Sequence, residues 1–178
     1  METGEADAVP LWQRLLIGRK PKRTLLRAAV TAVTIWTAAY FILVPVRITG
    51  GSMEPSYKDK SVNLINRMAY WRSNPKRGDV VALVTDPAGR RWAHPRNFYF
   101  KRIIGLPGET VRIHIGKVFV DGQLLSEPYV RFWQPWEDAP RKLGLDEFLV
   151  IGDNRGMPQE WHWWGTVKAN QIAGKAVL

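Results

Sequence analysis

Cysteine is absent from this chain of 178 residues, and histidine occurs only three times. The absence of cysteine excludes disulfides and thiolate-bound metals. Low-complexity tracts and internal repeats are also absent, and the composition, with 46% apolar and 24% charged residues, is typical of a globular protein. The length suits one domain with an appendage. We expect neither a metal nor a cofactor.

Acidic residues are outnumbered: 16 Asp and Glu stand against 26 Lys and Arg, which gives a net charge of +10. Residues 1–46 carry 6 basic and 3 acidic side chains, and residues 47–178 carry the other 20 and 13. A basic surface attracts either nucleic acid or anionic lipid. The nine tryptophans favour lipid, because tryptophan is enriched where a membrane meets water.

A long uncharged run, AAVTAVTIWTAAYFILVPV, extends from residue 28 to residue 46. As a helix it would span about 28 Å, close to the hydrocarbon thickness of a bilayer. Two alternatives compete with a membrane helix. A buried helix of a soluble protein would need a larger domain around it, and a cleaved signal peptide has a shorter apolar core with a small-residue cleavage site. We predict a retained membrane anchor over residues 25–46.

Basic residues cluster before this run, in the stretch GRKPKR of residues 18–23. Cytoplasmic flanks of membrane helices carry an excess of Lys and Arg. Residues 1–24 are therefore expected in the cytoplasm, and residues 47–178 on the exported side. Because the genome lies on the other side of the membrane, we expect the lipid bilayer as a partner and no nucleic acid.

The exported part has the pattern of a β-rich domain. Alternating or β-branched runs predict strands at 61–66, 79–84, 97–105, 110–116, 117–125 and 147–154. The stretches 85–97 and 131–144 are rich in Pro, Gly and charge and are predicted as loops, while residues 170–178 fit either a strand or a helix. The fold class is mainly β, a β-rich catalytic domain preceded by one N-terminal transmembrane helix.

One serine closely follows the apolar run. Ser52 lies in RITGGSMEPSYKDK, after Gly50 and Gly51 and before Met53. Glycine permits close approach to the backbone, and Pro55 favours an extended conformation for the residue before it. The pattern fits a simple turn after a membrane helix as well as it fits a nucleophile held at a membrane surface. A nucleophilic serine needs a neighbouring base.

None of the histidines has a typical catalytic context. His94 lies in a predicted loop, His114 on the polar face of a predicted strand, and His162 among tryptophans. We expect surface or packing roles for all three.

Lysine is the other candidate base. It accepts a proton only when neutral, and burial in apolar surroundings lowers its pKa from about 10.4. Lys101 fits this requirement, because strand alternation places it between Tyr99 and Ile103 on one face, with Arg102 on the other. The alternative is an edge-strand lysine that discourages aggregation.

A further motif, GDNRGMPQEWHWWG, occupies residues 152–165. Gly-Asp-Asn at the end of a strand is typical of a turn. We interpret Asp153 and Arg155 as structural charges and expect Asp153 to pair with Arg102. Alone, this motif is not diagnostic.

Taken in order, these segments resemble the type I signal peptidases, the membrane-bound serine proteases that remove secretory signal peptides. GGSMEP is similar to the nucleophile box, RGDVV (77–81) to the family's Arg-Gly-Asp-Val-Val strand, and KRIIGLPGE (101–109) to the lysine box. GDNRGMPQEWHWWG is similar to the last box. The resemblance extends from the anchor to the C-terminus and implies that Ser52 is the nucleophile and Lys101 the general base.

The resemblance also implies roles for neighbouring residues. The oxyanion and substrate would be bound with the help of Gly50, Gly51, Met53 and Pro55, and structural support would come from Arg77, Asp79, Arg102, Asp153, Arg155 and Glu160. The main oxyanion donor would be the Ser52 backbone N–H.

The chain departs from the family pattern in the last box. Gly-Met-Pro at 156–158 stands where the family has Asp-Asn-Ser, and that serine normally helps to orient the lysine. Glu-Trp-His at 160–162 stands where the family has Asp-Ser-Arg. A salt bridge that ties this loop would therefore run between Glu160 and Arg155, or be lost.

The function implied is the removal of signal peptides from exported preproteins at the bacterial plasma membrane, with a single-pass anchor and an association with the secretion translocon. An extended substrate presents alternate side chains to the enzyme, which accounts for small residues at positions one and three before the cut. Two alternatives remain open. One is a catalytically weak relative that only binds signal peptides, and the other is a specialised peptidase that processes a pilin in conjugation.

Overall fold

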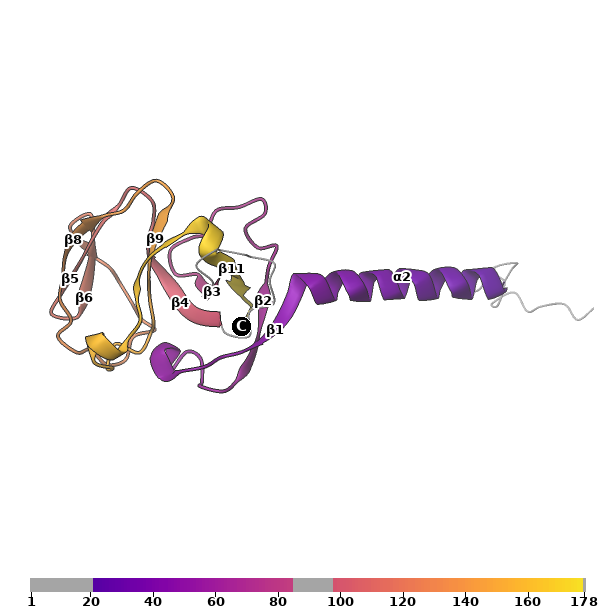
Figure 1. Cartoon of the computed structure of the whole chain (residues 1–178), viewed down its shortest axis with the longest axis horizontal. Helices are drawn as coiled ribbons and strands as arrows, with labels where there is room; N and C mark the ends of the chain where they lie inside the picture. Colours follow the sequence, from indigo (N-terminus) through magenta and orange to yellow (C-terminus); the bar gives the residue numbers. More distant parts are fainter. Residues whose placement is uncertain (1–20, 85–97, 178) are drawn as a thin grey trace, which may run out of the picture. The chain divides into compact units, whose positions relative to one another are not determined.

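The structure, a computed structural model, describes residues 21–84 and 98–177 and divides the chain into two units near Phe41. The predicted loop 85–97 and most of the basic N-terminus lie outside the described residues. Within the described residues, the first unit consists of helix α2 (Pro21–Ile42), and the second is built mainly from β-strands (Figure 1). The mainly β fold class preceded by one helix is confirmed.

Helix α2 is long and apolar enough to cross a membrane, with a mean hydropathy of 1.6 over an 18-residue window within Lys22–Ile42. The hydroxyls of Thr34 and Thr37 donate to the carbonyls of Val30 and Val33, four residues back, at 2.8 and 2.7 Å. These bonds satisfy within the helix the two threonine hydroxyls, which a bilayer would otherwise leave without partners.

The helix ends at Ile42, four residues before the predicted end of the anchor at Val46. The next residues form strand β1 (Leu43–Arg47), which pairs along its whole length with β2 (Val62–Asn66). Pro45 is compatible with this position because β1 is an edge strand, where a missing N–H is tolerated. An apolar run therefore continues across the boundary between helix and sheet.

The larger sheet has seven strands in the order β1-β2-β11-β3-β4-β9-β10, and all neighbours are antiparallel. Its other strands are β3 (Val80–Val84), β4 (Phe98–Gly105), β9 (Glu147–Ile151), β10 (Gly165–Lys168) and β11 (Ile172–Ala176). The ambiguous C-terminal segment is therefore a strand. Short 3-10 helices lie at η1 (Gly51–Met53), η2 (Gln159–Trp161) and η3 (Ala169–Gln171).

The smaller sheet has four strands in the order β7-β6-β5-β8. They are β5 (Thr110–His114), β6 (Lys117–Val120), β7 (Gln123–Leu124) and β8 (Asp138–Lys142). Figure 1 shows β5, β6 and β8 at one end of the β unit, away from β1 and β2. The prediction that 131–144 is entirely a loop is wrong, because β8 pairs with β5 despite its polar, proline-containing sequence.

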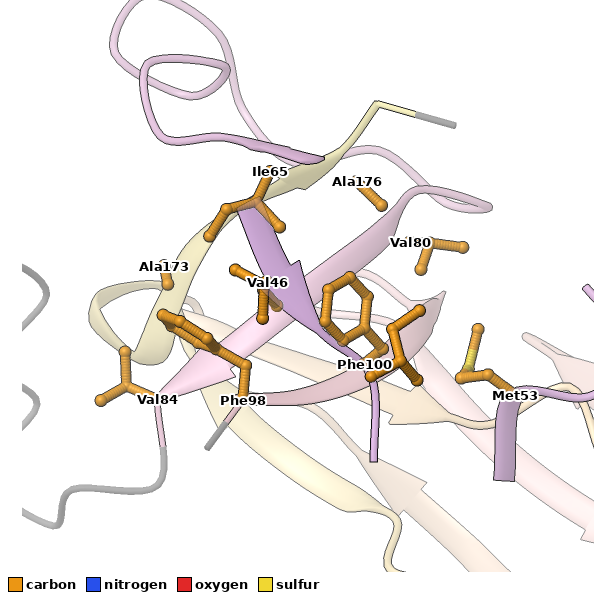
Figure 2. Close-up of a cluster of buried hydrophobic side chains, with 11 residues drawn as sticks. Val46, Met53, Ile65, Val80, Val84, Phe98, Phe100, Ala173 and Ala176 are labelled. Carbon is orange, nitrogen blue, oxygen red and sulfur yellow. The ribbon is translucent and has the colours of Figure 1, made fainter. Parts of the chain in front are cut away.

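Strand β3 is buried on both faces, as its continuous apolar sequence indicates. Val80, Ala82 and Val84 enter one cluster, and Val81 and Leu83 enter another. The first cluster also contains Val46, Ile48, Met53, Ile65, Phe98, Phe100, Ala173 and Ala176. Figure 2 shows Val46, Phe98 and Phe100 in its middle, with Met53 at its margin. The segment that carries Ser52 is thus fixed to the core by its neighbour Met53.

Strand β4 is paired unequally on its two sides. It pairs with β3 from Phe98 to Arg102, whereas β9 pairs only with Arg102, Ile103 and Gly105. Within the described residues, the segment 98–101 therefore has a strand on one side only. An open edge next to Lys101 is the feature of the fold that matters most for the site.

The two turns that flank β6, at Gly116 and Gly122, provide a test of the packing. Gly116 has φ +72°, and a Cβ there would lie 2.3 Å from the Gln134 carbonyl oxygen, whereas Gly122 has φ +81° with no atom within 4 Å of such a Cβ. Both alanine variants adopt an unfavourable backbone conformation, but only Gly116→Ala also displaces a neighbouring chain. We expect losses of about 3 kcal/mol for Gly116→Ala and about 1 kcal/mol for Gly122→Ala in the free energy of unfolding. Denaturant unfolding measures both, and equal losses would contradict the packing.

Candidate active site

Ser52 lies in η1, directly after the segment that follows β1. Gly50 has φ +95°, a conformation that favours glycine, and its N–H donates to Asp59 Oδ1 at 2.8 Å. Met53 is 1% exposed and anchors the turn in the core. Ser52 itself is only half-buried, in a turn whose next residue, Met53, is fixed in the core.

Lys101 comes from the open-edged half of β4 and is 1% exposed. Its Nζ lies 2.6 Å from Ser52 Oγ, at hydrogen-bond distance. Burial lowers the pKa of Lys101 to about 8, although the negative charge of Asp153 opposes the shift. A buried amine with a lowered pKa is neutral in a larger fraction of molecules near neutral pH, and only the neutral amine accepts a proton.

The Gly152–Asn154 turn holds the backbone of the serine. The Asn154 N–H donates to the Ser52 carbonyl at 3.0 Å, and Asn154 Nδ2 donates to the Gly51 carbonyl at 2.9 Å. The Gly51 carbonyl and the Ser52 N–H belong to one trans peptide and point in opposite directions. Asn154, for which the sequence analysis predicts only a place in a turn, therefore fixes the direction of the Ser52 N–H.

Asp153 pairs with Arg102, as expected. Its carboxylate accepts from Arg102 Nε at 2.8 Å and Nη2 at 2.6 Å, and its side chain is completely buried. Arg102 also donates to the Gly78 carbonyl at 2.7 Å and lies over the Tyr129 ring, 4.0 Å from its centre. This bidentate pair ties the turn to β4 one residue beyond Lys101.

Of the two outcomes expected for the salt bridge between Arg155 and Glu160, the structure shows its loss. Arg155 is 1% exposed and donates to Glu127, and its Nε donates to the Gly152 carbonyl at 3.0 Å. Glu160 lies exposed in η2. A buried arginine needs a buried partner, and Glu127 supplies one from a loop with no recognisable sequence signal.

Arg77 and Asp79 brace the start of β3 rather than the dyad. Arg77 donates to the Ile104 carbonyl and to Glu109. Asp79 accepts from the Tyr70 hydroxyl at 2.9 Å and from Lys175 Nζ at 2.6 Å. Arg77 and Asp79 therefore affect Lys101 only indirectly, because they help to align β3 with β4.

The residues expected to bind substrate are in different environments. Gly51 follows Gly50 in the turn, Pro55 is exposed, and Met53 is buried in the core rather than lining an open surface. The Gly50 N–H is already engaged by Asp59, so the Ser52 N–H is the better-placed oxyanion donor.

Two histidines fall within the described residues. His114 lies on β5 near Glu137, at 3.2 Å, on an exposed surface as expected. His162 packs edge-on against Trp136, with 4.8 Å between ring centres, and its Nε2 accepts the Gly152 N–H at 3.0 Å. That bond uses the nitrogen that a serine-activating imidazole would need.

These contacts place a half-buried serine hydroxyl at hydrogen-bond distance from a buried amine, an arrangement that suits a serine peptidase. The family described as signal peptidase, peptidase S26, matches residues 22–178, and the chain belongs to this family. It is similar to a probable signal peptidase I-2 of Synechocystis (34% identity, 88% of this chain and 70% of the relative). It is also similar to a signal peptidase I of Leptolyngbya laminosa (36%; 74% and 65%) and one of Bacillus amyloliquefaciens (31%; 97% and 88%).

Asn154 offers a test of how the serine backbone is held. Asn154→Ala keeps the backbone N–H donated to Ser52 but removes the donor to the Gly51 carbonyl, so the Ser52 peptide loses part of its orientation. We expect kcat for peptide cleavage to fall roughly fivefold with a small change in KM, since one hydrogen bond is worth about 1 kcal/mol. Asn74→Ala, at an exposed position, is the matched control. An unchanged kcat in Asn154→Ala would contradict this role.

Proposed function

We propose that the protein cleaves signal peptides from exported preproteins with Ser52 as nucleophile and Lys101 as general base. The observation that supports the dyad most strongly is the 2.6 Å separation of Lys101 Nζ and Ser52 Oγ. Lys101 is buried, which favours its neutral form, and Ser52 remains accessible. These are the two conditions that a serine–lysine pair requires.

The chemistry begins when neutral Lys101 takes the Ser52 proton as the hydroxyl oxygen attacks the scissile carbonyl. The oxyanion that forms is stabilised by the Ser52 N–H, whose direction is set through Asn154. The C–N bond then breaks, and the Lys101 ammonium gives its proton to the leaving amine. Water, deprotonated by Lys101, attacks the resulting ester and releases the signal peptide with regeneration of Ser52.

The open edge of β4 suits an extended substrate. Ile103 donates its N–H to the Asp79 carbonyl at 2.9 Å, on the β3 side. Because backbone groups alternate sides along an antiparallel strand, Lys101 also faces β3, whereas Phe98 and Phe100 direct their N–H and C=O groups to the open edge. A peptide that adds as a strand there would be bonded through its backbone, beside the dyad.

Backbone pairing leaves specificity to alternate side chains. In an extended substrate, the residues one and three before the cut face the enzyme. The first core cluster fills the region beneath this edge with Val46, Met53, Phe98 and Phe100. Little space then remains for bulky substrate side chains, in agreement with the small residues of signal-peptide cleavage sites.

The membrane is the expected setting of the reaction. Helix α2 has the length and hydropathy of a membrane span, and basic residues precede and begin it, so the N-terminus is assigned to the cytoplasm and the β unit to the exported side of the plasma membrane. Trp133, Trp161 and Trp163 are 52%, 73% and 48% exposed, as suits contact with an interface, whereas Trp136 is buried. An association with the secretion translocon at this membrane is part of the proposal.

Replacement of either dyad residue tests the proposal. In detergent-solubilised protein with a preprotein substrate, Ser52→Ala and Lys101→Ala are expected to lower cleavage by at least a thousandfold, because each removes a reacting group. Ser56→Ala and Lys58→Ala, on exposed neighbours in the same segment, should cleave at the wild-type rate. A wild-type rate in either dyad variant would overturn the assignment, and peptide binding without turnover by the wild-type protein would favour the binding-only alternative.

The pH dependence of cleavage gives a second test. The amine must be neutral to accept the serine proton, and the pKa of Lys101 is lowered to about 8 by burial. The logarithm of kcat/KM should therefore rise with slope one as pH increases, and level off above about pH 8. Rates measured from pH 6 to pH 10 locate this limb. A limb centred near pH 10.4, the value of an ordinary lysine, would contradict the proposed base.

A further inference from the structure

His162 is buried within the site, although the proposed reaction makes no use of it. It is 3% exposed, follows η2 and packs edge-on against Trp136, which is itself 2% exposed. Its Nε2 accepts the Gly152 N–H at 3.0 Å. A buried backbone N–H without an acceptor costs about 1–3 kcal/mol, so this imidazole satisfies a group that needs a partner.

The surroundings of His162 require a neutral side chain. Burial, followed by the positive charges of Lys101 and Arg155, lowers the pKa of His162 to about 3. The imidazole therefore stays uncharged wherever Lys101 works as a base, and its Nε2 remains an acceptor. A lysine or arginine here would add a third buried cation and offer no acceptor to the Gly152 N–H.

The bond to Gly152 bears directly on the serine. Gly152 has no room for a side chain, because a Cβ there would lie 2.2 Å from the Ser52 carbonyl oxygen and 2.4 Å from His162 Nε2. Two residues further on, Asn154 binds the Ser52 and Gly51 carbonyls. The imidazole thus lies next to the Ser52 carbonyl and binds one end of the turn that holds the serine backbone.

We propose that His162 is a positioning residue of the catalytic site, whose Nε2 accepts the Gly152 N–H and holds the Gly152–Asn154 turn against Ser52. The catalytic part of this inference rests on the proposed function. It assigns His162 a role through Gly152 and Asn154, without contact with the substrate. An acceptor at this position is the essential feature, and the ring is one means of supplying it.

The test compares His162→Leu with His162→Gln in the full detergent-solubilised chain. Leucine offers no acceptor, whereas the glutamine Oε1 reaches the place of Nε2. We expect His162→Leu to lower kcat at least tenfold with little change in KM, and His162→Gln to retain most of kcat. His114→Leu, which removes an exposed histidine on β5, is the matched control and should keep the wild-type rate.

A second readout does not depend on activity. Hydrogen exchange of the Gly152 amide should be slow in the wild-type protein and in His162→Gln, and fast in His162→Leu, while thermal unfolding confirms that each variant is folded. Equal kcat in wild type and His162→Leu would overturn the inference, as would equal loss in folded Leu and Gln variants. If the wild-type protein and Ser56→Ala both fail to cleave preprotein, the proposed function is wrong. The exchange pattern would then still report the contact, but its catalytic meaning would be lost.

Discussion

The contact between a buried amine and an accessible hydroxyl places the strictest demand on this fold. Lys101 must be shielded from water for its pKa to fall, yet its Nζ must reach Ser52 Oγ, which a substrate must also reach. The structure meets both needs by taking the lysine from a strand interior and the serine from a turn at the margin of the core. Removal of the shielding would leave a charged lysine that cannot accept a proton.

The rest of the site can be understood as a frame around this contact. Met53 anchors the serine turn in the hydrophobic core, and the Gly152–Asn154 turn binds the backbone of Ser52 through a hydrogen bond. The Asp153–Arg102 pair binds that turn to β4, the strand that carries Lys101. The open half of β4 remains free of a strand partner within the described residues, beside the reacting atoms. The serine turn and β4 are thus held firmly by the core and by the Gly152–Asn154 turn, while the open edge of β4 leaves access for a substrate.

The sequence predicted much of this arrangement because its signals are local. The alternating pattern of β4 and the continuous apolar sequence of β3 predict buried strands. The position of Lys101 between Tyr99 and Ile103 predicts an amine in apolar surroundings. The errors arose where distant partners decide the structure. The apolar run passes from helix into β1 because β2 pairs with it, the polar β8 is a strand because β5 lies beside it, and Arg155 pairs with Glu127 through tertiary packing. His162 and Asn154 lie in the motif of residues 152–165, but their contacts beside Ser52 were not predicted because they too depend on tertiary packing.

The central claim is that Lys101 titrates as a shielded amine. NMR of protein labelled with 13C at lysine Cε, with a Lys101→Arg variant to assign the signal, measures this titration directly in the detergent-solubilised chain. The account predicts a midpoint near 8 for Lys101, well separated from the exposed lysines. A midpoint near the ordinary value of about 10.4 would show that the amine is solvated and would contradict the account.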